Sequence, residues 1–382
     1  NTRFQIASIC FFVVLLVNYS RYRKVSLKST KLYQLLLSVV TIELLFDMIT
    51  VITVNNPDRV SAFMNRFCHQ VFIGSMDLAI FLVYLYLRDQ AHTAARTKMW
   101  KKILIMTPLI LSETEVVFGR LDYKVTAYGS YSCGPMADTV YISVAIYLLL
   151  ILSTLFRYRS KTDKWKRQTI IICVLMWVAA AVIQALLPYY LVSSIAVTMM
   201  LYSLYYAFEN PKDNIEAKTG CFNKEAFRRM MIECLAHRKS FIVVNIVMYD
   251  IENVYKSYGH EFGHRYLSIL ESELRQIFGT GVFRSKGDTL SVFFIDQDEN
   301  ILERKLSAVR AILKASVNVG DIEVSGREHI DVIKCPEYAD SVDRILNIIE
   351  FMSEQAPAHD AEIIRIDEAL IEKIERRNTI EH

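Results

Sequence analysis

Residues 240–263 read SFIVVNIVMYDIENVYKSYGHEFG, and this stretch governs how the C-terminal part of the chain folds. Its opening run, Ser240–Met248, is rich in β-branched residues and predicts a buried strand. Apolar residues at helical spacing predict a helix over Glu261–Ile277. A strand that leads into a helix is typical of a sheet with helices packed against it.

The neighbouring segments extend this pattern. Gly287-Asp288 separates two short apolar runs, which predicts a β-hairpin. Strands that alternate with helices predict an α/β domain whose helices pack against one sheet. The remaining predicted elements are helices over Glu225–His237, Asn300–Lys314 and Ser341–Met352, and strands over Val282–Arg284, Leu290–Ile295 and about 316–334.

The composition separates the chain into two parts. Its 382 residues are 53% hydrophobic and 22% charged, with a mean hydropathy of +0.24, whereas soluble domains are about 45–50% apolar and about 25% charged. Residues 1–208 carry 21 basic and 10 acidic side chains, and residues 209–382 carry 23 basic and 31 acidic ones. A single soluble globule, a disordered chain and a small disulfide scaffold are excluded. We expect a membrane bundle joined to a mildly acidic soluble domain.

Long apolar runs before residue 209 predict membrane-spanning helices, since about 17–25 apolar residues cross a bilayer as a helix. The fourth run is the least regular, because Glu113 and Glu115 shorten its apolar part. The seven predicted spans are 4–19, 31–54, 70–87, 102–118, 138–156, 169–187 and 189–208.

Basic residues in the loops predict the direction of the spans. Sixteen Lys and Arg residues follow the first, third and fifth spans, and five lie on the opposite side. Cytoplasmic loops are the basic ones, so we expect a multi-pass protein of the bacterial inner membrane with its N-terminus outside and its C-terminal domain in the cytoplasm. The sixteen are Arg21, Arg23, Lys24, Lys28, Lys31, Arg88, Arg96, Lys98, Lys101, Lys102, Arg157, Arg159, Lys161, Lys164, Lys166 and Arg167; the five are Arg3, Arg59, Arg66, Arg120 and Lys124.

Two of the seven cysteines, Cys68 and Cys133, fall on the predicted outer side. Disulfides persist outside the cytoplasm, so these two residues form a candidate disulfide that would hold the loop 119–138 over the helix bundle. Two unrelated thiols are the alternative, because the sequence alone does not determine pairing.

Five carboxylates lie within or at the ends of the predicted spans: Glu43, Asp47, Asp77, Glu113 and Glu115. Charged side chains inside a bilayer are costly and often mark a ligand or ion path. They form a candidate pocket, open to the outside, for a small cationic or amine-bearing signal. The alternative is hydrogen bonding between helices by protonated carboxyl groups. A proton pump or channel is not favoured, because no regular acidic relay runs through the spans.

Three motifs in the C-terminal part resemble those of GGDEF domains, the diguanylate cyclases. Thr219–Phe227 (TGCFNKEAF) resembles T-G-L-x-N-R-R-x-F, and Tyr258–Gly263 (YGHEFG) resembles Y-G-H-x-x-G. Arg284–Leu290 (RSKGDTL) falls where R-Y-G-G-D-E-F belongs. The resemblance covers residues 216–356. The expected fold class is an α-helical bundle of seven membrane spans followed by a cytoplasmic α/β domain of this GGDEF-like, nucleotide cyclase-like type.

The positions that carry the family's chemistry are replaced in this chain. Cyclisation needs metal ions to activate a hydroxyl and neutralise phosphate charge, and the single carboxylate of Asp288 does not supply enough ligands for two hard cations. Asp250 follows the lost ligand position by three residues, on another face. We expect an inactive domain that binds Mg²⁺ only if residual nucleotide binding survives. The positions that the resemblance identifies are Val247 for the metal-binding Asp, Glu252 for the phosphate-binding Lys, Tyr255 and His264 for the guanine contacts, Lys286 and Thr289 in the signature turn, and the retained Gly287 and Asp288.

Further partners follow from the resemblance and the charge. The family's inhibitory R-x-x-D pattern would fall on Ile277–Thr280 and is absent, so product binding there is not expected. GGDEF domains act in pairs, which implies a homodimer, and the acidic balance argues against nucleic-acid binding. The expected partners are membrane lipid, a second copy of the chain and an unknown extracellular small molecule.

Together these features favour a membrane receptor of the cyclic di-GMP system with an inactive GGDEF-like relay domain. The segment from Tyr206 to Thr219 is short, so movement of the last span would reach the soluble domain. The alternatives are a weakly active diguanylate cyclase and a small-molecule transporter with a regulatory domain.

The C-terminal residues predict a strand over Ile363–Asp367 and a helix over Glu368–His382 with an apolar stripe of Leu370, Ile374 and Ile380. This helix resembles the connector from a GGDEF domain to an EAL domain, a cyclic di-GMP phosphodiesterase, and implies that an EAL domain follows. A natural terminus is the alternative. The expected domains are 1–208 (sensor), 209–218 (linker), 219–356 (degenerate GGDEF) and 357–382 (connector).

Overall fold

The computed structural model divides into two compact units, Asn1–Asn210 and Pro211–His382, which are described separately. Two residues of the predicted basic loops, Arg96 and Lys161, lie outside the described residues. The structure describes residues 2–91, 98–126, 129–160, 163–187, 191–210, 213–236, 240–295, 298–324, 327–355 and 362–380.

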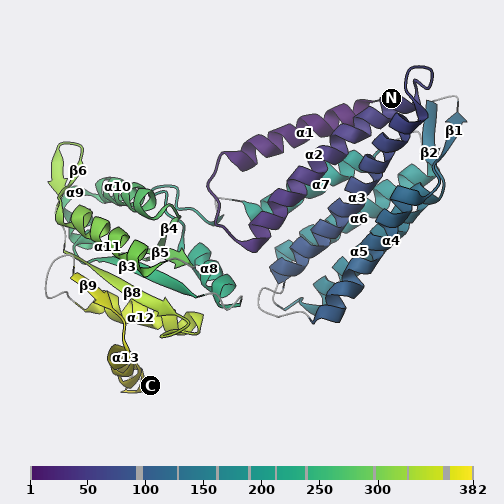
Figure 1. The fold of residues 1–382 in the computed structure, drawn as a ribbon. Coiled ribbons are helices and arrows are strands. Elements are labelled where there is room, and N and C mark those ends of the chain that lie inside the picture. Colours follow the sequence, from purple (N-terminus) through teal and green to yellow (C-terminus); the bar gives the residue numbers. More distant parts are fainter. Residues whose placement is uncertain are drawn as a thin grey trace. The chain divides into compact units, whose positions relative to one another are not determined.

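Helices of the first unit coincide in position with the predicted spans (Figure 1). Among the described residues, α1, α2, α3, α5 and α6 are long and apolar enough to cross a membrane. α4 carries Glu113 and Glu115, and α7 has only 12 residues, so the seven-span bundle stays a prediction. The helices are α1 (Arg3–Ser20), α2 (Lys28–Val54), α3 (Ala62–Ala91), α4 (Met99–Phe118), α5 (Pro135–Arg157), α6 (Lys164–Leu186), α7 (Ser193–Leu204) and the π-helix η1 (Tyr205–Glu209).

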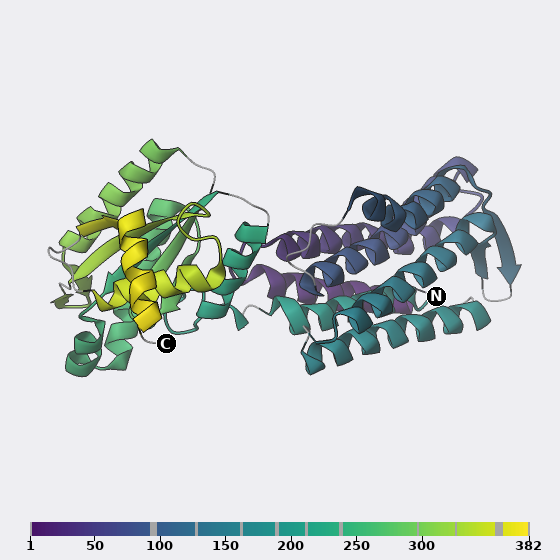
Figure 2. The ribbon, with the colours of Figure 1, turned by 90° about the horizontal axis from the view of Figure 1, so that it is seen from below.

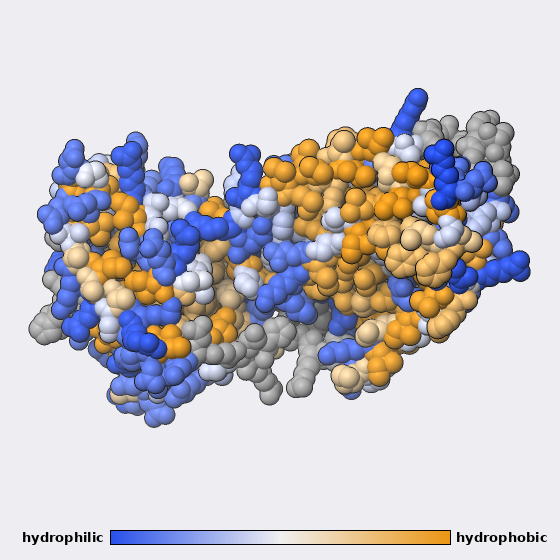
Figure 3. Space-filling view, turned by 45° about the horizontal axis from the view of Figure 1, so that its top comes forward, coloured by the Kyte–Doolittle hydropathy of each residue, from blue (hydrophilic) through white to orange (hydrophobic). Residues whose placement is uncertain are grey.

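Much of the apolar surface of these helices faces away from their common core. In the membrane-length windows of α1, α5 and α6, 28% of the residues are buried, while large apolar side chains such as Val13, Ile142 and Leu175 are exposed. Figure 3 shows the orange, apolar surface that results over this unit. An apolar surface of this extent is what a lipid environment would cover.

The end of α7 and its continuation η1 are tied to neighbouring helices by tyrosine hydroxyls. Tyr86 of α3 donates a hydrogen bond to the buried carboxylate of Glu209 (2.9 Å). Tyr33 of α2 donates to the carbonyl oxygen of Leu201 (2.9 Å). These bonds fix the last turns of the first unit within its core.

A short antiparallel hairpin, β1 (Asp122–Thr126) and β2 (Gly129–Cys133), joins α4 to α5. The sequence-based prediction for this segment is only a loop, although Leu121, Tyr123 and Val125 alternate with polar residues as in a strand. Cys133 ends β2, and both Cys133 and the buried Cys68 are free thiols. The predicted disulfide is therefore not present in this structure.

The second unit contains a five-stranded sheet in the order β4-β5-β3-β8-β9. The central β3 pairs antiparallel with β5 and β8, and β9 runs parallel to β8. The elements are α8 (Lys224–Ala236), β3 (Phe241–Met248), α9 (Ile251–Tyr258), α10 (His260–Phe278), β4 (Val282–Lys286), β5 (Thr289–Ile295), α11 (Glu299–Lys314), β6 (Val317–Val319), β7 (Ile322–Val324), β8 (Glu328–Cys335), α12 (Val342–Glu354), β9 (Glu362–Arg365) and α13 (Glu368–Ile380).

Helices cover both faces of this sheet, with α10 and α11 on one side and α12 on the other (Figure 1). Val244 and Ile246 of β3 join the core formed with α10 and α11. The alternate residue Phe241 packs against Phe293, which in turn contacts Phe227 of α8 on the other face. A strand buried on both faces in this way is apolar throughout, which explains the uninterrupted run in the sequence.

Helix α9 is absent from the sequence-based prediction. Ile251, Val254, Tyr255 and Tyr258 do recur at helical spacing, and Ile251 and Val254 are buried. The pattern covers only eight residues, fewer than the roughly 10–12 by which a helix is usually identified. Gly259 separates α9 from α10 with a φ of 85°, a conformation that glycine adopts without strain.

The C-terminal helix α13 lies across α12 (Figure 2). Ion pairs join Arg344 to Glu375 (2.6 Å) and Arg377 to Glu354 (2.6 Å). Ile374 is 4% exposed, so part of the predicted apolar stripe is buried within the unit. The side chain of Ile380 lies outside the described residues.

Candidate functional site

The opening motif of the GGDEF-like region lies beside the signature hairpin. The backbone N–H of Phe222 donates to the carbonyl of Val282 (2.8 Å), and its carbonyl accepts from the N–H of Arg284 (2.7 Å). The Arg284 guanidinium also donates to the carboxylate of Glu216 (3.1 Å). Segments distant in the sequence are thereby held together at one edge of the sheet.

The signature turn, Gly287-Asp288, closes the hairpin of β4 and β5. Arg284 folds back and donates to the carbonyl of Gly287 (2.8 Å). Lys286 donates from Nζ to the Ser353 hydroxyl of α12 (2.6 Å). The lysine at the position of the family's first Gly therefore links the turn to α12.

The position that the sequence resemblance aligns with the family's metal ligand is apolar and buried. Val247 is 0% exposed and lies between its register partners Thr289 and His329. Thr289 donates to the carboxylate of Asp288 (2.9 Å). Among the described residues, no three His, Cys, Asp or Glu side chains form a group that could hold a metal ion. The residues present do not fit the Mg²⁺ pair that cyclisation uses.

Asp250, the nearest other carboxylate in the sequence, is held by Arg327. Its Oδ2 accepts hydrogen bonds from the backbone N–H (3.1 Å) and Nε (3.3 Å) of Arg327, and Asn253 donates to Oδ1 (3.2 Å). Burial acts to raise the pKa of Asp250, but the bonds from Arg327 outweigh it and hold the pKa below its ordinary value. Asp250 therefore links the start of α9 to the start of β8.

Tyr255 and His264, at the two guanine-contact positions, lie side by side with ring centroids 5.6 Å apart. The Tyr255 ring also lies 5.1 Å from that of His260, and its hydroxyl accepts from Arg284 (3.3 Å). A Cβ added to Gly263 would overlap this ring. The space between α9 and α10 is filled by side chains, and a purine entering it would have to displace Tyr255.

Charged side chains of both signs lie in this region. Glu252, at the phosphate position, is exposed on α9 and pairs with Lys256 (3.7 Å). Burial and nearby cations, chiefly Lys218, lower the pKa of His264. The carboxylate of Glu252 would repel a phosphate group placed next to it.

A buried polar group on the sheet was not singled out from the sequence. His329 Nε2 and Asp331 Oδ1 lie 2.8 Å apart and are fully buried, and burial raises the pKa of Asp331 although His329 opposes this. Asn245, the register partner of Asp331, accepts a hydrogen bond from Ser291 (2.6 Å). The available signal was Asn245 within the otherwise apolar β3; β8 carries several polar residues and gave no such signal.

The five carboxylates of the predicted pocket do not form one group. Glu43 and Asp47 lie one turn apart on α2 and are 0% and 1% exposed. Asp47 accepts a hydrogen bond from Ser194 of α7, and the Gln5 side chain of α1 lies beside it. Gln5 and Ser194 are site residues that sequence reasoning missed, although polar residues within apolar helices were the signal.

Asp77 and Glu113 form a second group between α3, α4 and α5. Asp77 is fully buried and accepts a hydrogen bond from Ser143 (2.5 Å). The Glu113 carboxylate interacts electrostatically with Asp77 and lies against Gly74. Glu115 instead folds against Gly119 at the end of α4. The sequence indicates depth along a helix, but packing determines which way each side chain faces.

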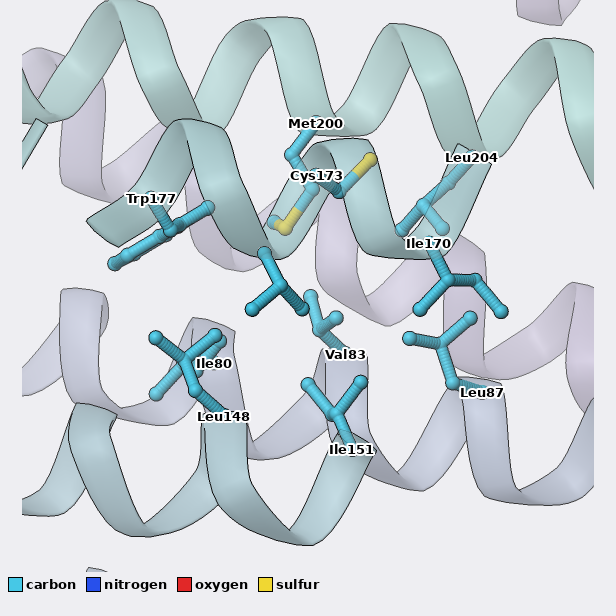
Figure 4. Close-up of a pocket in the computed structure, with 11 residues that line it drawn as sticks. Ile80, Val83, Leu87, Leu148, Ile151, Ile170, Cys173, Trp177, Met200 and Leu204 are labelled. Carbon is cyan, nitrogen blue, oxygen red and sulfur yellow. The ribbon is translucent and has the colours of Figure 1, made fainter. Parts of the chain in front are cut away.

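An apolar cavity lies between α3, α5, α6 and α7 (Figure 4). None of the five carboxylates lines it, so it offers no charged partner to a cationic ligand. The lining residues are Ile80, Val83, Leu87, Leu148, Ile151, Ile170, Cys173, Val174, Trp177, Met200 and Leu204.

Several solved structures are similar to this chain, and they include GGDEF domains. The GGDEF domain of TpbB (YfiN) from Pseudomonas aeruginosa is 18% identical, with a TM-score of 0.35, over 42% of this chain and 99% of that one. The FimX GGDEF domain from the same organism is 14% identical, with a TM-score of 0.36, and the match covers 40% of this chain and 99% of that one. The diguanylate cyclase SiaD of that organism, solved with its activator SiaC, is 14% identical, with a TM-score of 0.36. This match covers 70% of this chain and 100% of that one.

No family model matches the sequence, and no curated protein matches it. At these levels of identity, functional residues are not transferred from the solved structures position by position.

Proposed function

We propose that this chain is a membrane-bound receptor of cyclic di-GMP signalling whose GGDEF-like domain is catalytically inactive and relays a signal. The observation that carries this proposal is which side chains occupy the positions expected to bind the nucleotide and its metal ions. Val247 is buried and apolar at the metal position, and the Tyr255 ring fills the space beside Gly263. Both the ligands for metal ions and the room for guanine are then lacking.

The relay role is supported by how the domain is built. The signature hairpin is bonded to α12 through Lys286 and to the opening motif through Arg284. A shift of the segment that enters the domain at the opening motif would therefore move the hairpin. A homodimer, with its N-termini outside and these domains in the cytoplasm, is the assembly that this role requires.

Calorimetry and a product assay on the full chain in lipid nanodiscs test the proposal. We expect no heat of binding with GTP and Mg²⁺ and no cyclic di-GMP formed. Asp288→Ala is the matched control, because loss of a weak activity in this variant would assign that activity to the site. Mg²⁺-dependent turnover that Asp288→Ala abolishes would instead establish the weakly active cyclase.

Within the same proposal, the relay acts on an EAL phosphodiesterase domain. The resemblance of residues 368–382 to the GGDEF–EAL connector supports this part. Reading the coding sequence beyond His382 tests it, and a stop codon there or a following domain of another kind would rule it out.

A further inference from the structure

Four polar side chains from three helices meet inside the first unit: Gln5 of α1, Glu43 and Asp47 of α2, and Ser194 of α7. We call these four residues the α1–α2–α7 site. Each is at most 1% exposed. Side chains of this kind within apolar helices are costly unless they satisfy one another or hold a ligand.

The four side chains do not satisfy one another. Ser194 donates to Asp47, but neither carboxylate oxygen of Glu43 has a hydrogen-bond partner within the described part of the chain. The Gln5 amide lies beside Asp47, yet within the described part of the chain neither its nitrogen nor its oxygen has a hydrogen-bond partner in good geometry. Three free oxygen atoms therefore remain, two on Glu43 and one on Gln5.

The charges of the site are unbalanced as well. Asp47 lies one turn away from Glu43 on the same helix, and its negative charge would repel that of Glu43. Two ionised carboxylates this close in a buried setting need a positive charge between them. A divalent cation would neutralise both.

We propose that the α1–α2–α7 site binds one Ca²⁺ ion. Ca²⁺ takes 6–8 oxygen ligands in irregular geometry. Two carboxylates, an amide oxygen and a hydroxyl offer up to six. Mg²⁺ fits less well, because it demands octahedral geometry and retains several waters, for which a fully buried group leaves little room. No His or Cys belongs to the site, which disfavours Zn²⁺.

This inference goes beyond the proposed function and does not depend on it, since ion binding is measured whether or not the GGDEF-like domain is active. The test uses the full chain in nanodiscs. Equilibrium binding of ⁴⁵Ca²⁺ should saturate at one ion per chain, and CaCl₂ should raise the unfolding temperature while NaCl and MgCl₂ at equal ionic strength do not.

Glu43→Gln keeps the shape of the side chain and removes its charge, and we expect it to weaken Ca²⁺ binding by at least about tenfold. Ser194→Ala removes one neutral ligand. This variant should also weaken Ca²⁺ binding, and it replaces Glu43→Gln as the test if that variant does not fold. Glu115→Gln, at the end of α4, is the matched control and should bind Ca²⁺ as the wild type does.

Two results would overturn the inference. The first is the absence of saturable Ca²⁺ binding to the wild-type chain. The second is a Glu43→Gln variant that binds Ca²⁺ normally and unfolds at a higher temperature without any added ion, because the carboxyl groups would then be protonated and would hold no cation.

Discussion

Asp250 stabilises the GGDEF-like unit through Arg327, and this contribution depends on pH. Its pKa is lowered in the folded chain, because the bonds from Arg327 outweigh the opposing effect of burial. A carboxylate of this kind stabilises the fold above its unfolded pKa of about 3.9 and loses that contribution as the pH falls through the lower folded value.

We therefore expect Asp250→Asn to lower the free energy of unfolding by about 1 kcal/mol or less at pH 7, since solvent screens the exposed Arg327. The difference from the wild type should shrink below about pH 4. Urea unfolding between pH 3 and pH 7 measures it. Glu252→Gln, which alters an exposed carboxylate on the neighbouring helix, is the control. A difference that is constant over this pH range would contradict the role of ionised Asp250.

Gly263 is required by the ring packed against it. A Cβ at this position would overlap Tyr255, and overpacking of this kind costs about 1–3 kcal/mol. Gly263→Ala should lower the unfolding temperature, even though alanine favours a helix over glycine by about 1 kcal/mol.

The double variant Gly263→Ala, Tyr255→Ala isolates the cause. Compared with Tyr255→Ala alone, the added alanine should be neutral or stabilising, since the overlapping ring is gone. If Gly263→Ala destabilises both backgrounds equally, the steric explanation fails. Differential scanning calorimetry of the four chains makes the comparison.

Among the secondary-structure elements, α13 depends on α12 for its stability. Ile371 and Ile374 are 8% and 4% exposed, and the two ion pairs lie beside them. Ile374→Ala should destabilise the packing of α13 by about 2 kcal/mol or more. Hydrogen exchange of the α13 amides should then accelerate, whereas Glu372→Ala, on the exposed side of the helix, should leave it nearly unchanged. Equal exchange in both variants would mean that α13 is not held by this face.

Elements with a clear apolar pattern were predictable from the sequence, and the rest depended on tertiary packing. β3 and the β4–β5 hairpin were predicted because apolar runs and a Gly-Asp turn are local signals. α9 was missed because its helical pattern of Ile251, Val254, Tyr255 and Tyr258 spans only eight residues. The carboxylates were located along their helices, but their division into two groups depends on helix rotation, which only packing determines.

The whole chain combines an apolar, basic first part with an acidic second part, and the positions of the basic loop residues predict its topology. Asn56 lies between α2 and α3 and Ser160 follows α5, and both are exposed. If the N-terminus is outside, Asn56 faces the outside and Ser160 the cytoplasm.

Single cysteines at these two positions test the topology directly. In a chain whose Cys68 and Cys133 are replaced by serine, we expect Asn56→Cys to react with a membrane-impermeant maleimide in cells stripped of their outer membrane. Ser160→Cys in the same chain should react only after the inner membrane is permeabilised. The chain with Cys68 and Cys133 replaced by serine and no added cysteine gives the background labelling of the other native thiols. The reverse labelling pattern would place the GGDEF-like domain outside, away from cytoplasmic GTP and cyclic di-GMP, and would rule out the proposed relay regardless of what its nucleotide site retains.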